Sequence, residues 1–252
     1  MTDFTSVLPF IRIHAAAEAP RESCGIVIAD PDGKPVYIAC KNLAKETEHF
    51  VLDSADFARA EDTGEIIAIA HSHVFESPAP SSADLTGIER TRVPWLIVNH
   101  PLGTFTITKP SGYVAPLVGR AFVHGSHDCY GLIRDAFRER GVELPEFDRV
   151  YGWWDEPNGP ELYGEENITS AGFAIIHRGS VDSNSLKSLH PYDVLIIQVA
   201  AKHPNHGAVY IGNGMILHHL IGQLSRREFF GEHWQKRTVL VLRHKSMMKE
   251  SD

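Results

Sequence analysis

The chain has 252 residues, of which 43% are hydrophobic and 22% charged, a composition typical of globular proteins with room for two cores. The formal net charge of −8 excludes the broad basic surface of a general nucleic-acid-binding protein. No stretch approaches the roughly 18 to 20 apolar residues that a membrane span requires. The opening MTDFTSVLPF has no basic region followed by an apolar core, so we expect synthesis and folding in the cytoplasm.

The first part of the chain alternates apolar runs with turn residues. Apolar spacing favours a helix within residues 3–18, ending before Pro20. The runs GIVIAD and KPVYIAC indicate two strands around a Pro-Asp-Gly turn. Further elements are expected in the order helix, buried strand, capped helix and strand pair, over residues 53–62, 65–73, 81–90, 94–100 and 103–109.

From Lys109 the segment KPSGYVAPLVG has no periodicity, and we predict a linker over residues 111–119 between domains at 1–110 and 120–252. A helix is expected over 129–140, stopped by Gly141. A loop-rich stretch follows, whose aromatic side chains either line a groove or pack the loop (Tyr151, Trp153, Trp154, Tyr163). Strands are expected over residues 192–199, 206–212, 215–220 and 237–244.

The segment HSHVFESPAPSSAD has the spacing of a metal site. His71 and His73 lie two apart on a predicted strand, so both imidazoles project from the same face and can reach one metal ion. Asp84, in the first turn of the following helix, can add an oxygen ligand. Three protein ligands and one open position for water is the arrangement of catalytic zinc. Upstream, Glu22 is a candidate base, and Ser81 a candidate donor to a developing oxyanion.

The full pattern is Glu22, then His71-x-His73, seven residues, and Ser81-x-x-Asp84. It resembles the signature of the JAMM (MPN-plus) metallopeptidase family over about residues 1–110. The resemblance implies Zn²⁺ held by His71, His73 and Asp84, with Glu22 as the base and Ser81 as the transition-state donor. Family members often have Pro after the second histidine, where this chain has Val74. Because that position is not a ligand, the departure weakens the match little.

A second candidate site starts at Cys129, one of only three cysteines, which are too few for a disulfide framework. In HDCYGLIRDAF the thiol begins an amphipathic helix, where the helix dipole lowers a thiol pKa. His206, ahead of a strand, is the candidate base. His218, on the next strand, is the candidate orienting residue. His219 is its rival, since strand alternation places these two on opposite faces.

Three blocks carry a second resemblance: Asp-Cys-x-Gly-Leu, His-Gly-x-x-Tyr-Ile-Gly and Ile-Leu-His. They resemble the NlpC-type cell-wall cysteine peptidases over about residues 120–245. The resemblance implies Cys129 as the nucleophile, His206 as the base and His218 as the orienting residue. Most members have Ser after the cysteine, where this chain has Tyr130.

The two modules in this order resemble the lambda-type phage tail-tip assembly proteins over nearly the whole chain. The resemblance implies α+β domains: a curved sheet with flanking helices, then a papain-like fold. It implies a protein made in the cytoplasm of the bacterial host and built into a virion or particle tail tip beside other tail-tip proteins. The cysteine peptidase would cut peptidoglycan stem peptides for DNA entry, and the metallopeptidase would process a tail protein. The alternatives are a structural component with one or both sites inactive, and a bacterial cell-wall hydrolase.

Overall fold

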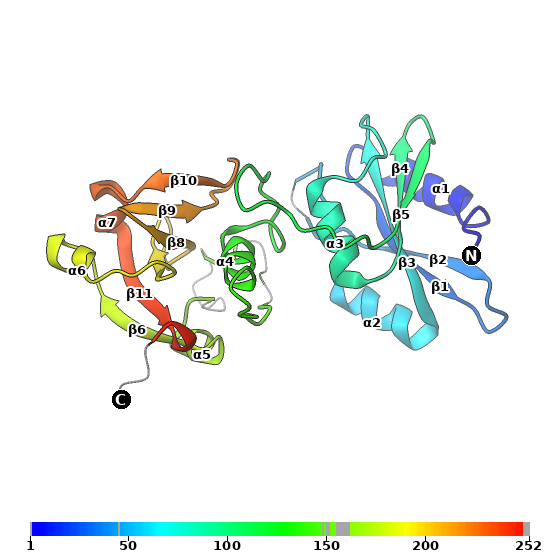
Figure 1. The fold of residues 1–252 in the computed structure, drawn as a ribbon. Helices are drawn as coiled ribbons and strands as arrows, with labels where there is room; N and C mark the ends of the chain where they lie inside the picture. The colour runs from blue at the N-terminus through cyan, green and yellow to red at the C-terminus, as the bar shows by residue number, and fades with distance from the viewer. Residues whose placement is uncertain (1, 45, 148, 150–151, 155–161, 249–252) are drawn as a thin grey trace. The chain divides into compact units, whose positions relative to one another are not determined.

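The computed structural model describes residues 2–44, 46–147, 149, 152–154 and 162–248 (Figure 1). The chain forms two compact units, Met1–Ala115 and Pro116–Asp252. The boundary between them falls inside the predicted linker 111–119. Glu89 accepts hydrogen bonds from the amides of Ser111, Gly112 and Tyr113, at 2.6, 2.9 and 3.1 Å, and so attaches the start of this segment to the first unit.

In its described residues the first unit is one five-stranded sheet with three helices, in the order α1 Leu8–Glu18, β1 Cys24–Ala29, β2 Pro35–Cys40, α2 Ser54–Thr63, β3 Glu65–Val74, α3 Ser82–Thr91, β4 Trp95–His100 and β5 Phe105–Thr108. The strand order is β2-β1-β3-β4-β5, and β3 with β4 is the one parallel pair in this sheet. The parallel pair needs a crossover connection, which α3 supplies.

Alternation along β3 assigns its side chains to two cores. Ala68 and Ala70 pack with α1 on one face of the sheet. Ile69 faces the other side, where Ala60 of α2 and Ile88 of α3 complete the core. His71 and His73 continue the Ile69 row, so the end of β3 delivers both imidazoles to the α3 side.

The part of the second unit that the structure describes is a six-stranded antiparallel sheet with four helices, in the order α4 Cys129–Arg138, α5 Glu165–Ser170, β6 Phe173–Arg178, α6 Ser183–Lys187, β7 Val194–Ile197, β8 His206–Gly212, β9 Met215–His218, β10 Arg226–Phe229, α7 Glu232–Arg237 and β11 Thr238–His244, followed by a 3₁₀ turn at Lys245–Met247. The strand order is β10-β9-β8-β7-β11-β6.

Helix α4, which begins at Cys129, covers one face of this sheet. Its buried Leu132, Ile133 and Phe137 pack with residues such as Val209 of β8 and Leu217 of β9. The opposite face packs on a second core that includes Phe230 and Trp234. The expected α+β fold of both halves is confirmed. In the part of the chain that the structure describes, no helix is long and apolar enough to cross a membrane.

Candidate functional sites

The first site lies where β3 ends against the start of α3. The Nε2 atoms of His71 and His73 are 3.1 Å apart. The Asp84 carboxylate lies 3.3 Å from His71 Nε2 through Oδ1, and 3.4 Å from His73 Nε2 through Oδ2. All three side chains are buried. The structure thus brings the three predicted metal ligands together.

Ser81 is the N-cap of α3 and fixes Asp84 through a capping box. The Asp84 amide donates to Ser81 Oγ at 3.1 Å, and the Ser81 amide donates to Asp84 Oδ2 at 2.7 Å. The capping box therefore fixes the orientation of the Asp84 carboxylate, which faces the two histidines. In this arrangement the Ser81 hydroxyl accepts from the backbone and keeps its own proton to donate.

Two aromatic rings hold the His71 imidazole. Phe50 stacks on it with ring centroids 4.6 Å apart, and Trp95 meets it edge-on at 5.5 Å. Trp95 lies against α3 at Gly87, where an added Cβ would come within 2.3 Å of the indole ring. Gly87 is therefore required for the packing that fixes the first histidine.

Glu22 lies two residues before the start of β1 and is buried. Cys24 pairs with His71 in the antiparallel register, and Ser23 bonds to Ser72, so the same register places Glu22 opposite His73. Burial raises the pKa of Glu22 to about 7, although the neighbouring His71 and His73 act to lower it. A carboxyl group with a pKa near neutrality can both take up and release a proton at pH 7.

The donor set fits a zinc ion. One donor atom from each of His71, His73 and Asp84 lies within 4.8 Å of the others. His73 Nδ1 is 2.6 Å from the Ser77 carbonyl oxygen and donates to it, so that in the neutral imidazole Nε2 has the lone pair. The Nε2 atom of His71 lies 3.1 Å away, so a proton or a metal ion must lie between the two nitrogens. Two imidazoles and a carboxylate are ligands that zinc accepts.

The electrostatics of this site also favour added positive charge. Burial disfavours the charged form of His73, yet its hydrogen bonds to Asp84 and the Ser77 carbonyl raise its pKa to about 9. The pKa of Asp84 is well below its usual range. Burial acts to raise it, but the interactions with His71 and His73 lower it by more than burial raises it. The site is therefore arranged to stabilise a cation beside the His73 Nε2 atom.

The second site begins at Cys129, the first residue of α4. Asp128 is the N-cap: its Oδ1 accepts from the Gly131 amide at 2.8 Å, and its Oδ2 from the Gly125 amide at 2.9 Å. Gly131 is required because the Ser126 carbonyl oxygen lies 1.9 Å from where a Cβ would stand. The Asp-Cys-x-Gly pattern is thus the local geometry that presents the thiol at the helix start.

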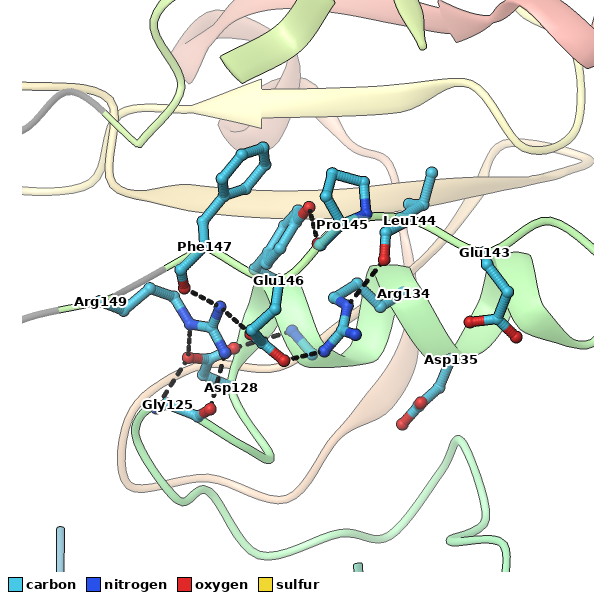
Figure 2. A network of polar contacts seen from close by, with 12 residues as sticks. Gly125, Asp128, Arg134, Asp135, Glu143, Leu144, Pro145, Glu146, Phe147 and Arg149 are labelled. Carbon is cyan, nitrogen blue, oxygen red and sulfur yellow. Dashed lines mark hydrogen bonds and ion pairs between the residues drawn. The ribbon is translucent and has the colours of Figure 1, made fainter. Parts of the chain in front are cut away.

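Arg149 holds this N-cap in place, as Figure 2 shows. Its Nε donates to Asp128 Oδ2 at 2.7 Å, and both side chains are 3% exposed. It also donates to the Gly125 carbonyl at 2.7 Å, the Glu146 carboxylate at 2.7 Å and the Phe147 carbonyl at 2.8 Å. One guanidinium thus joins the turn before Cys129 to the segment after α4.

Tyr130 belongs to the same support. It is buried, its hydroxyl donates to the Pro145 carbonyl at 2.8 Å, and the Arg149 guanidinium lies over its ring. Tyr130 does not line the cavity beside Cys129. The departure from the common Ser at this position therefore adds to the packing of the segment after α4.

The thiol pKa differs from the expectation based on the helix dipole. Burial, together with the adjacent Asp128 carboxylate, raises the pKa of Cys129, while the Tyr163 hydroxyl and the Gly207 amide act to lower it. The helix dipole is outweighed because the thiol is partly enclosed and its nearest charge is negative. The side chain is therefore a neutral thiol before a base acts on it.

His206 and His218 form a buried pair on β8 and β9. His206 Nε2 lies 3.2 Å from His218 Nδ1, and both rings contact Trp234. Burial, with a contribution from His218, lowers the pKa of His206 to about 3, so the imidazole is neutral near pH 7. The rival His219 instead lies 3.1 Å from the Gln223 carbonyl oxygen. The structure thus joins His206 to His218 and not to His219.

Cys129 and His206 line one cavity of about 330 Å³. Its wall includes the aromatic Phe122, Trp153 and Trp154. Of the other aromatic residues considered for a groove, Tyr151 lies outside the described residues. Tyr163 places its hydroxyl 3.4 Å from Cys129 Sγ.

The sequence predicted only that Tyr163 lines a groove or packs a loop, and it gave Glu228 no role, yet the structure places both residues in this site. Tyr163 reaches the thiol because Gly207 has no side chain: a Cβ there would lie 3.0 Å from the Tyr163 hydroxyl. Glu228 accepts from His218 Nε2 at 3.1 Å. Neither stands in a motif with the residues that it contacts, although the run of aromatics around Tyr163 was a partial signal.

The folds and sites define a two-module protein, and family comparisons identify both modules. The model for prokaryotic homologs of the JAB domain matches residues 5–108, and that for the NlpC/P60 family matches residues 119–243. A desampylase from Pyrococcus furiosus is 30% identical over 84 residues, covering 31% of this chain and 60% of that protein.

Relatives that combine the two modules identify the family more closely. The tail tip assembly protein K of Escherichia phage N15 is 38% identical over 239 residues, covering 94% of this chain and 93% of that protein. The protein of the same name from Escherichia phage lambda is 38% identical over 191 residues, covering 76% of this chain and 88% of its own. The chain therefore belongs to the tail tip assembly protein K family, and the expected resemblance is confirmed.

Proposed function

We propose that this chain is a tail-tip peptidase of a phage or phage-like particle, in which the unit Pro116–Asp252 is a cysteine endopeptidase that cleaves peptidoglycan stem peptides. The observation that carries the proposal is the placement of Cys129, at the start of α4, in one cavity with His206, which is hydrogen-bonded to His218. A nucleophile, a base and a residue that orients the base are the parts that acyl transfer requires.

The geometry supports a mechanism that starts from a neutral pair. The Cys129 thiol and the His206 imidazole are both uncharged at rest, so His206 takes the Sγ proton as Sγ attacks the peptide carbonyl. Amides in the first turn of α4 and the Tyr163 hydroxyl lie near Sγ and can stabilise the oxyanion. His206 then protonates the leaving amine, and water releases the acyl group from the thioester.

For the unit Met1–Ala115 we propose a zinc metallopeptidase that processes a tail protein during assembly. His71, His73 and Asp84 would hold the metal. Zinc, when bound, polarises a carbonyl group and lowers the pKa of a coordinated water. Glu22, opposite His73, would carry the proton from water to the leaving amine, and the Ser81 hydroxyl would donate a hydrogen bond to the carbonyl oxygen.

The proposed biological setting is taken from the two phage tail tip assembly proteins that this chain resembles. The protein is made in the host cytoplasm, joins other tail-tip proteins and acts on the wall during DNA entry, without binding nucleic acid itself. A structural tail-tip role with inactive sites is the alternative. It predicts normal incorporation into particles by variants that lack Cys129 or the metal ligands.

The test is to incubate the purified protein with peptidoglycan and identify the released peptides by mass spectrometry. Wild-type protein should release them, whereas Cys129→Ala should lower release by at least about 10³-fold, since it removes the nucleophile. The His71→Ala/His73→Ala variant is the matched control and should release them at the wild-type rate. Full release by folded Cys129→Ala protein would refute the cysteine assignment.

A further inference from the structure

The carboxylate of Glu228 has no part in the mechanism proposed above, yet it is hydrogen-bonded to His218 of that site. Glu228 lies on β10, where Arg226 pairs with His218 and Glu228 pairs with Ile216 of β9. Directly opposed residues share a face of an antiparallel pair, as do residues two apart. The register therefore brings Glu228 and Arg226 to the side of the sheet on which His218 lies.

Three donors surround the Glu228 carboxylate. Its Oε1 accepts from Trp234 Nε1 at 3.0 Å. Its Oε2 accepts from Arg226 Nε at 2.8 Å and from His218 Nε2 at 3.1 Å. Trp234 also packs on both histidine rings, with centroids 6.0 Å from His206 and 5.0 Å from His218. The carboxylate is thus held in one orientation by the residues that enclose the pair.

This contact fixes the tautomers of both histidines. An ionised carboxylate only accepts hydrogen bonds, so His218 Nε2 must carry a proton. In a neutral imidazole the other nitrogen is then an acceptor, so His218 Nδ1 accepts and His206 Nε2 donates. The remaining nitrogen, His206 Nδ1, has the lone pair that can take a proton.

We propose that Glu228 is a positioning residue, which sets the proton arrangement of the His218–His206 pair and stabilises the imidazolium that forms when Cys129 loses its proton. The proton moves from Sγ to His206 Nδ1, and no proton passes to Glu228. This role rests on the proposed cysteine peptidase function, but it can be measured without a substrate.

The measurement is the rate at which iodoacetamide alkylates Cys129 in the full chain as a function of pH, read by mass spectrometry of the peptide that contains Cys129. The charged and titratable groups that face the reacting pair are unchanged in sequence in every variant: Asp128, Arg149 and Tyr163 around the thiol, with Arg226 and His219 around the histidines. Arg226 loses its carboxylate partner when Glu228 is replaced, and its remaining charge adds to the shift in the same direction. Buried Cys24 and Cys40 should stay unmodified, which checks the folding of the first unit, and near-UV circular dichroism checks the second.

Glu228→Ala should move the midpoint of alkylation up by about one pH unit, an approximately tenfold lower rate at pH 7, because the imidazolium loses its carboxylate. Glu228→Gln should show a smaller shift, since its amide oxygen can still accept from His218 while the charge is gone. Glu228→Asp should partly restore the wild-type midpoint. If the alanine variant does not fold, the glutamine variant decides.

Glu232→Gln is the matched control, because Glu232 is 76% exposed and pairs with Lys236. It should keep the wild-type profile. ¹⁵N NMR of histidine-labelled protein gives a second readout: both rings should be Nε2–H tautomers in wild type, and His218 should populate the Nδ1–H form in Glu228→Ala. A wild-type alkylation profile in folded Glu228→Ala and Glu228→Gln would overturn the positioning role.

The two proposals fail separately. A shifted profile in Glu228→Ala, with no peptidoglycan cleavage by wild-type protein, would leave the positioning role standing and overturn the peptidase assignment. Peptidoglycan cleavage by wild-type protein, with an unshifted alkylation profile in the Glu228 variants, would support the peptidase assignment and overturn the positioning role.

Discussion

The two sites of this chain differ in how they are assembled from the sequence. In the first unit, three ligand-type residues lie between His71 and Asp84, on one strand end and the first turn of the next helix. In the second unit, Cys129, Tyr163, His206, His218 and Glu228 come from separate elements. The first site is therefore largely a property of a short segment, and the second is a property of a folded sheet.

The largest expected effect tests the independence of the two sites. The His71→Ala/His73→Ala variant should lose zinc from about one equivalent per chain to almost none, because one carboxylate alone does not form a zinc site. Measurement is by metal analysis after dialysis. Cys129 alkylation in the same sample should be unchanged, since the second unit has its own core. Equal zinc content in variant and wild type would remove the proposed metal centre.

A smaller effect tests how far the second site depends on residues distant in the sequence. Arg149→Met should destabilise the second unit by about 3–5 kcal/mol, because it leaves the buried Asp128 carboxylate without its cation. Urea unfolding followed by circular dichroism gives the free energy. Arg178→Met is the matched control: its ion pair with Glu165 is exposed, and its loss should have little effect. Equal effects of the two substitutions would contradict the supporting role of Arg149.

The smallest expected effect is a loss of unfolding free energy in the second unit at acid pH. Burial lowers the pKa of His206 to about 3, and burial with nearby Arg120 lowers the pKa of His127 to about 4. Since the unfolded state binds these protons from about pH 6.5 downward, both contributions are present above that pH and are lost as pH falls. Between pH 6.5 and 5 each histidine should cost the second unit about 2 kcal/mol of unfolding free energy.

Urea unfolding at the two pH values checks this expectation. His127→Gln should lose its share of the dependence. A wild-type slope in His127→Gln would show that this histidine does not contribute.

Element prediction was strongest where apolar periodicity was long. The buried strand expected over residues 65–73 is β3 Glu65–Val74, and the helix expected over 129–140 is α4 Cys129–Arg138. Strands β6 and β10 were not predicted, because short segments with charged residues, such as RREF, have no distinctive pattern. The predicted domain limits 1–110 and 120–252 stay a prediction.

The sequence by itself determined the family, the α+β fold class, and the residues proposed as metal ligands, nucleophile and base, because fixed spacings place such side chains on strand ends and helix starts. Only the tertiary structure decided that the Cys129 thiol has a raised pKa, that His218 and not His219 contacts His206, and that Tyr163, Arg149 and Glu228 complete the second site. Burial and cross-strand register set these properties, and both arise from contacts between segments far apart in the chain.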